Sequence, residues 1–424
     1  MISKQYGSLP HRVVRPGWVV TILMVSPLFC VAGQAAAGPL GEKPDTFLWN
    51  ASSLVAAKAA QQDGAPMVVA DVRGLIDEAN EALSAPPVSV AVDKVRTAAS
   101  GDPHDYFSVA PYWWPDPATS DGLPWVQRDG KVNPDNDADR LKLDALVKAV
   151  RRLALAWYFT GEERYAEHAV AFLRTWFVAP DTRMNPHLRY SQAIPGTTDG
   201  RSTGMIDTVF LRDLVDGIRL LQGSSSLTAA DESALRGWFS DYLDWFLTSE
   251  FGREEAATKN NHATWYYAQI GLYAAFTGRE ADVRPVYEER LPVLAQQQFG
   301  PDGSQPFEIR RTRSMHYSAY NLTAWEDIVV LGRRMGLDYY RDSDPVGERI
   351  QAGLHYLARY TPGDSEWPHP EIRASPERYR LFPVFIRAIG LEGDETIETA
   401  LGQAIVPNGA GFLRLVYGSP NSDK

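Results

Sequence analysis

Helical periodicity that recurs in pairs is the feature that most restricts how this chain can fold. In "DRLKLDALVKAVRRLALAWYF" (139–159), apolar residues recur at steps of three and four, which is the spacing of one helix face. A Thr160-Gly161 turn follows, and "EERYAEHAVAFLRTWF" (162–177) then repeats the pattern. Two amphipathic helices joined by a short turn predict an antiparallel helical hairpin.

The hairpin pattern recurs along the chain. "YFTGEE" (158–163) is echoed by "AFTGRE" (275–280), again between two helical stretches. Further helices are expected at 80–98, 205–221, 227–247, 262–276, 281–297, 319–335, 345–360 and 376–390, whereas strand signals are scarce. Hairpins in series predict an all-α fold, an (α/α) toroid or part of one. A loose helical solenoid is the alternative that periodicity leaves open.

The first 37 residues have the features of a secretory signal. Arg12 and Arg15 precede an apolar run at 17–33, and Ala35 and Ala37 are the small residues that a signal peptidase needs. We therefore expect cleavage after Ala37, a single catalytic domain at 38–424, and a periplasmic or secreted protein. The one cysteine, Cys30, lies within this signal, so the mature chain is expected to have no disulfide and no cysteine-ligated metal.

The charge balance restricts the partners. The formal net charge is −11, and loss of the signal with its three basic residues (Lys4, Arg12, Arg15) makes it −14. Such an excess of acid argues against nucleic acid and anionic membranes as partners. The histidines lack HExxH spacing, and we expect neither a metal nor another cofactor. The protein is expected to be a monomer, and an acidic ligand would need a local cluster of arginine, histidine and amide groups.

Long aperiodic segments at 101–137, 178–204, 298–313 and 361–375 interrupt the helices. Loops of this length within a compact domain are usually functional. If all of them emerge at one end of a toroid, they form one cleft.

Two stretches near these segments contain groups that can bind anions or transfer protons. "TKNNHATWYY" (258–267) is either a helix start capped by an asparagine with a packed histidine, or a donor-rich corner of a site, because one asparagine suffices as a cap. "EIRRTRSMHYSAY" (308–320) is either a solvated basic turn with core tyrosines, or an anion site. The candidate residues are Asn260, Asn261, His262, Trp265, Arg310, Arg313, His316 and Tyr317.

Two further stretches suit a sugar polymer. In "HDYFSVAPYWWPDP" (104–117), the adjacent aromatics either hold the loop on the core or stack on the apolar faces of sugar rings. The loop "RMNPHLRYSQAIPGTTDGRSTG" (183–204) has the hydrogen-bonding groups of a ligand wall. Together with the basic stretch, they predict a site for an acidic polysaccharide, because guanidinium and amide groups bind carboxylates. The residues assigned to substrate binding here are Tyr112, Trp113, Trp114, Arg189, Tyr190 and Gln192.

The motifs "NNHATW" (260–265) and "RRTRSMHY" (310–317) resemble the paired active-site motifs of the alginate lyase superfamily, the α/α-toroid polysaccharide lyases. The stretches at 104–117 and 184–196 resemble the version found in its alginate-lyase-domain group, which borders on enzymes of glucuronan. The resemblance covers about residues 100–390. In that family an Asn-His pair and an Arg…Tyr pair separated by seven form the catalytic set. The resemblance therefore implies catalytic roles for Asn261, His262, Arg310 and Tyr317, with Arg313 as an alternative to Arg310.

The activity implied is β-elimination on a polyuronate, alginate or glucuronan. Asn261 and Arg310 would neutralise the uronate carboxylate with assistance from His262, and Tyr317 would protonate the leaving oxygen. Tyr317 or His262 could also be the base, and the sequence leaves both open. Two other functions remain possible from the sequence. The first is an α/α-toroid glycoside hydrolase, whose two carboxylates could come from Asp207, Asp302 and Glu308. The second is a non-catalytic polyuronate-binding protein.

Overall fold

The computed structural model describes residues 43–134, 139–340 and 344–418, and these form one compact unit. The expected signal peptide at 1–37 lies outside the described residues. Within the described ranges, no helix is both long and apolar enough to cross a membrane.

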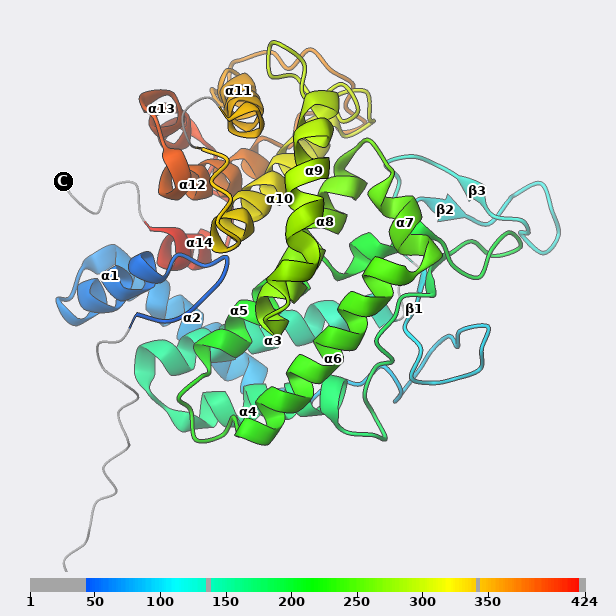
Figure 1. Ribbon diagram of the computed structural model, residues 1–424, viewed down its shortest axis with the longest axis horizontal. Coiled ribbons are helices and arrows are strands. Elements are labelled where there is room, and N and C mark those ends of the chain that lie inside the picture. Colours follow the sequence, from blue (N-terminus) through cyan, green and yellow to red (C-terminus); the bar gives the residue numbers. More distant parts are fainter. Residues whose placement is uncertain (1–42, 135–138, 341–343, 419–424) are drawn as a thin grey trace, which may run out of the picture. The chain divides into compact units, whose positions relative to one another are not determined.

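The described chain is mostly helical (Figure 1). The helices are α1 (Ala51–Gln62), α2 (Pro66–Ser84), α3 (Asp139–Thr160), α4 (Glu163–Leu173), α5 (Leu211–Leu220), α6 (Ala229–Thr248), α7 (Glu250–Ala256), α8 (Asn261–Thr277), α9 (Glu280–Gln298), α10 (Ser314–Arg334), α11 (Pro345–Ala358), α12 (Leu381–Glu392), α13 (Glu395–Gln403) and α14 (Ala410–Tyr417). Short turns of other helical types are η1 (Arg174–Val178), η2 (Ser202–Thr208) and η3 (Arg378–Arg380).

The inner helices form a closed ring. α3 packs on α5, α5 on α8, α8 on α10, α10 on α12, α12 on α14, α14 on α2, and α2 again on α3. Figure 1 shows the closure, where the blue helices α1 and α2 meet the red helix α14. The helices α4, α6, α9, α11 and α13 pack against ring members or one another from outside. The predicted α/α toroid is confirmed, and the solenoid is wrong because the first and last described helices are in contact.

The sequence explains the central position of α8. Asn260 caps its start, and Gly278 ends it in the left-handed conformation with φ 73°. Apolar residues surround the whole helix, and almost every residue from Ala263 to Phe276 is buried. A helix that is apolar all round must be covered on every side.

The expected helix at 80–98 is wrong. The helix there is α2, which ends at Ser84. Pro86 and Pro87 follow, and proline both removes a backbone donor and disfavours helical geometry in the residue before it. The start of α10 also differs from the expected 319, because the helix begins at Ser314 and so includes Tyr317.

The two loops that were expected to bind sugar lie side by side. The segment 101–137 contains β1 (Phe107–Val109), β2 (Trp113–Trp114) and β3 (Val126–Gln127), and the segment 178–204 contains β4 (Tyr190–Ala193). β1 pairs with β4 in parallel, with Phe107 opposite Tyr190, while β2 pairs with β3 in an antiparallel hairpin. The β1–β4 ladder connects the two loops, and Tyr112 of the first loop contacts Tyr317 near the start of α10.

Candidate active site

The first residues of α8 and the segment before α10 are joined by a buried carboxylate. Glu308 accepts hydrogen bonds from the backbone N–H and from Nδ2 of Asn261, both at 2.7 Å. Burial raises the pKa of Glu308, and the two bonds from Asn261 oppose that shift. The pair fixes the Asn261 amide, which uses only one of its two Nδ2 hydrogens on Glu308.

A second buried carboxylate orients His262. Glu255 Oε1, on α7, lies 2.6 Å from Nδ1 of His262, and Glu255 is 1% exposed. Burial lowers the pKa of His262, but Glu255 and, to a smaller extent, Glu308 together raise it above its ordinary value. Because Nδ1 is bonded to Glu255, Nε2 is the ring nitrogen that remains for a ligand.

Tyr317 lies in a polar cluster in the first turn of α10. Its hydroxyl is 2.7 Å from the hydroxyl of Tyr112 and accepts a hydrogen bond from Arg311 Nη2 at 3.0 Å. The Arg311 guanidinium also lies 4.0 Å from the centre of the Tyr317 ring. Burial raises the pKa of Tyr317 well above its ordinary value, and Arg311 only partly opposes this. The phenol is therefore neutral and can donate a proton.

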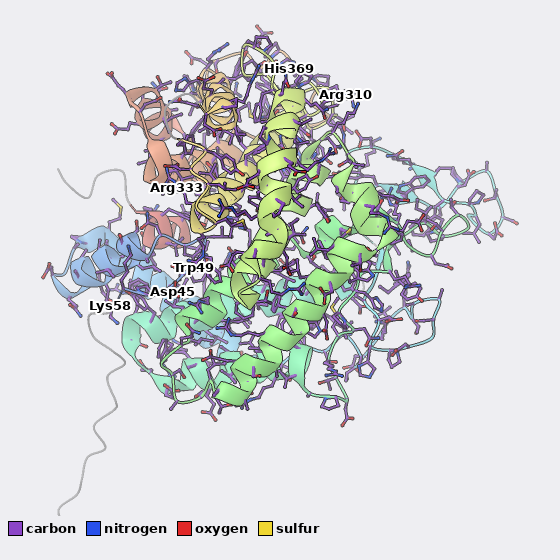
Figure 2. The ribbon with its side chains drawn as sticks, viewed as in Figure 1. Asp45, Trp49, Lys58, Arg310, Arg333 and His369 are labelled. Carbon is purple, nitrogen blue, oxygen red and sulfur yellow. The ribbon has the colours of Figure 1, made fainter. Side chains whose placement is uncertain are left out.

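The arginine beside Tyr317 is thus Arg311, whereas the spacing of seven selects Arg310. Arg310 is exposed, its guanidinium lies 5.0 Å from the centre of the Phe307 ring, and in Figure 2 it projects at the upper right of the molecule as viewed. A spacing of seven aligns two residues on one face only within a continuous helix. Because α10 begins at Ser314, residues 306–310 form turns instead and the alignment is lost. The same Nη2 atom of Arg311 also donates to Asp129 Oδ1 at 2.8 Å.

The alternative arginine, Arg313, is buried and already paired. Its Nε and Nη2 atoms both donate to Glu377 at 2.9 Å, so its planar fork is occupied by a protein carboxylate.

His316 stacks on Tyr320 with ring centres 5.6 Å apart. Burial, with help from Arg380 and Arg313, lowers the pKa of His316 to about 3, so this imidazole is neutral.

Gln192 belongs to a separate network close to His262. Its Nε2 donates to Asp207 at 2.8 Å and its Oε1 accepts from Arg201 Nη2 at 2.8 Å. Its backbone has φ 48°, a strained value for a residue other than glycine. Burial lowers the pKa of Arg201, while Asp207 and Glu255 oppose the shift. The Arg201 guanidinium therefore interacts electrostatically both with Asp207 of this network and with Glu255, the partner of His262.

The other expected binding residues lie in two places. Trp113 and Trp114 are half-buried in the β2–β3 hairpin, where Trp114 Nε1 donates to the carbonyl of Lys131 at 2.9 Å. Tyr190 is half-buried and Arg189 is exposed at the neighbouring loop. These residues can reach a long ligand, but no described contact joins them to Tyr317.

Asn260 and Trp265 each have a structural partner, Asn260 in α8 and Trp265 in α10. Asn260 Oδ1 accepts the backbone N–H of His262 at 3.3 Å, so Asn260 is the helix cap and Asn261 is left for another task. Trp265 is 3% exposed and stacks on Tyr320 with ring centres 4.8 Å apart. Its Nε1 is buried without a hydrogen-bond partner among the described residues.

Sequence reasoning missed Glu255, Arg201, Asp129 and the role of Arg311. Glu255 lies only seven residues before His262, but α7 ends at Ala256 and α8 begins at Asn261, so the spacing within a single helix does not align this pair. Asp129 lies 182 residues before Arg311, so no local spacing connects that pair. Of these four residues, only Arg311 could have been identified from the sequence, because it belongs to the arginine cluster next to Tyr317.

The carboxylates that a hydrolase would need are committed elsewhere. Asp207 is buried and accepts from Ser108, Tyr106 and Gln192. Glu308 is held by Asn261, and Asp302 is an exposed turn residue that accepts the N–H of Ser304. Among the described side chains, histidine, cysteine, aspartate and glutamate form no group that could hold a metal ion.

The ring encloses a cavity of about 1,100 Å³ that is lined from every inner helix. Trp265, His316 and Tyr320 line it at the end where α8 and α10 begin. Because His316 immediately precedes Tyr317, this end of the cavity lies next to the catalytic candidates along α10.

Comparisons with known proteins give the family of this chain. A family model described as alginate lyase matches residues 89–367. The crystal structure of an alginate lyase from Bacteroides ovatus superposes with a TM-score of 0.83 at 35% identity, covering 88% of this chain and 99% of that one. Alginate lyase A1-III from Sphingomonas species A1 gives a TM-score of 0.48 at 16% identity, covering 82% and 93%. None of the curated protein sequences matches. The model match spans most of the chain and includes both central motifs, so this chain belongs to the alginate lyase family and is a polysaccharide lyase.

Proposed function

We propose that the enzyme cleaves a polyuronate, alginate (polymannuronate) or glucuronan, by β-elimination and leaves a 4,5-unsaturated uronate at the new chain end. The observation that carries this is the Tyr317 hydroxyl, which accepts a hydrogen bond from Arg311 at 3.0 Å, while Glu255 orients His262 at the start of the neighbouring helix α8. The Bacteroides ovatus relative is an alginate lyase, which supports the same substrate class.

The carboxylate must be neutralised before the C5 proton can leave, because negative charge then builds on that group. We assign this to Asn261 and to Arg311, which takes the place of Arg310. The free Nδ2 hydrogen of Asn261 and the Arg311 guanidinium are preorganised by Glu308 and Asp129. Removal of one such preorganised donor typically costs about 10²- to 10³-fold in rate.

Two residues on different helices then transfer protons. In this proposal Nε2 of His262 takes the C5 proton, and the electron pair of that C–H bond forms the C4–C5 double bond. The C4–O bond breaks, and Tyr317 donates its proton to the leaving oxygen. The raised pKa of Tyr317 suits a proton donor better than a base, and the bond from Glu255 to Nδ1 leaves Nε2 of His262 as the acceptor.

The aromatic and polar loops would hold the remaining sugars. Tyr112, Trp113, Trp114 and Tyr190 offer ring surfaces, and Arg189 offers a charge for a carboxylate. We retain the proposals of a signal peptide at 1–37 and export to the periplasm or the medium. Detection of a mature N-terminus at Gly38 in the exported protein would test both.

A panel of defined polyuronates tests the reaction and its substrate together. Polymannuronate, polyguluronate and glucuronan are each incubated with enzyme, and the ultraviolet absorbance of the unsaturated product and the product masses are recorded. The proposal expects an absorbing product that has not gained the mass of water. Reducing ends without that absorbance would indicate a hydrolase, and binding without any product would indicate a sugar-binding protein.

A further inference from the structure

Arg380 differs from the other arginines that line the ring cavity. Arg151 pairs with Asp213 at 3.2 Å, Arg152 with Glu78 at 2.7 Å, and Arg212 with Asp327 at 3.0 Å. Arg387 pairs with Asp327 and Glu326, and Arg414 with Asp71. Among the described residues, no carboxylate lies within ion-pair distance of Arg380, and its buried Nε has no hydrogen-bond partner.

The position of Arg380 explains why it faces the cavity. It is the last residue of η3 and stands directly before α12, a ring helix. Its guanidinium lies 5.0 Å from the centre of the Tyr379 ring. Because a cation that is partly buried without a counter-charge is costly, the site favours an anion from outside the protein.

The side chains around Arg380 complete a sugar-sized surface. Trp265, His316 and Tyr320 line the same end of the cavity and stack on one another through Tyr320. Nε1 of Trp265, a side chain 97% buried, and Nδ1 of His316 have no partner among the described residues. These groups match those of a uronate. The apolar ring surface suits its C–H face, the unused donor and imidazole nitrogen suit its hydroxyls, and the guanidinium suits its carboxylate.

This surface lies one sugar away from the chemistry. His316 immediately precedes Tyr317 on α10, and Trp265 follows Asn261 by four residues, about 6 Å along α8. We propose that Arg380, Trp265, His316 and Tyr320 form a subsite in the ring cavity for the uronate next to the one being cleaved, with Arg380 binding its carboxylate. This inference rests on the proposed function, and it means that one end of the polymer enters the ring.

The test compares Arg380→Gln with Arg380→Lys, which keeps the charge. Arg164→Gln is the matched control, because Arg164 is an exposed arginine on α4, outside the ring, paired with Glu162. Steady-state rates are measured on a uronate tetramer and on the polymer, and melting temperatures are recorded for each variant. Loss of a charge-assisted hydrogen bond predicts a KM for Arg380→Gln raised about tenfold or more, with kcat nearly unchanged.

We expect Arg380→Lys to recover part of the affinity and Arg164→Gln to behave as the parent. Binding of the same tetramer to the Tyr317→Phe variant, with and without Arg380→Gln, is measured by calorimetry and should show the same loss. An active parent whose KM does not change in Arg380→Gln overturns the subsite and leaves the lyase intact. An equal rise in KM for Arg164→Gln also overturns the subsite, because the change in net charge alone would then explain the weaker binding. A parent inactive on every polyuronate contradicts the proposed function itself.

Discussion

Replacement of Tyr317 by phenylalanine removes one oxygen atom and separates catalysis from folding. That oxygen is 2.7 Å from the Tyr112 hydroxyl and 3.0 Å from Arg311 Nη2. Arg311 keeps its bond to Asp129, and the phenylalanine ring can keep the contact with the guanidinium. The loss of stability should therefore be about 1 to 2 kcal/mol, because two hydrogen bonds with a net contribution of about 1 kcal/mol or less each are lost.

The expected effect on the rate is larger. A positioned proton donor contributes roughly 10²- to 10⁴-fold, which corresponds to roughly 3 to 5 kcal/mol of transition-state stabilisation. The variant should therefore be folded, should bind oligouronate, and should release unsaturated product at no more than about one hundredth of the parental kcat. The assay is the initial rate of ultraviolet absorbance on the best polyuronate of the panel, with denaturant unfolding measured in parallel.

Tyr165→Phe is the matched control for this substitution. The Tyr165 hydroxyl also joins a polar side chain and an arginine, Asn80 at 3.0 Å and Arg164 at 2.8 Å, but it lies on α4 outside the site. It should lose a similar amount of stability and keep its rate. Near-parental kcat in Tyr317→Phe would refute the assignment of the proton donor. Equal rate losses in both variants would show that the effect acts through stability.

Other variants test the neighbouring groups. Arg311→Ala should lower kcat about 10²- to 10³-fold and Arg310→Ala far less, so equal losses would reject the contact with Tyr317 as the relevant one. Glu255→Gln removes the carboxylate that raises the pKa of His262, so the acidic limb of the kcat/KM profile should move to lower pH, and an unmoved limb would exclude His262 as the base. Because the pKa of His262 is raised in the folded protein, the Glu255–His262 pair stabilises the fold fully below pH about 6.5, the ordinary pKa of histidine. This stabilisation is lost as the pH rises through the pKa of the folded protein, and the free energy of unfolding of Glu255→Gln should not show this pH dependence. Asp216→Ala leaves three buried N–H groups, at 47–49, without their acceptor and should cost roughly 3 kcal/mol or more in urea unfolding. Asp213→Ala, its control, breaks only the partly exposed pair with Arg151 and should cost less than about 1 kcal/mol.

The sequence alone was enough to predict the helical hairpins and the chemical types of the site residues. The periodicity at 139–177 records which helix faces are buried, and it predicted α3 and α4 nearly to their ends. The motifs around Asn261, His262 and Tyr317 brought three groups to notice that the structure places at two adjacent helix starts. These features depend on local spacing, which a sequence displays directly.

Tertiary structure decided how the ring closes and which charges meet. Periodicity shows that a face is buried but not what covers it, so the contact of α14 with α2 was not predictable. The helical spacing rule applies only within a continuous helix, and because α10 starts at Ser314, Arg311 and not Arg310 contacts Tyr317. The partners Glu255 and Asp129 come from other elements. Their charges act through space, and distances between remote segments exist only once the chain has folded.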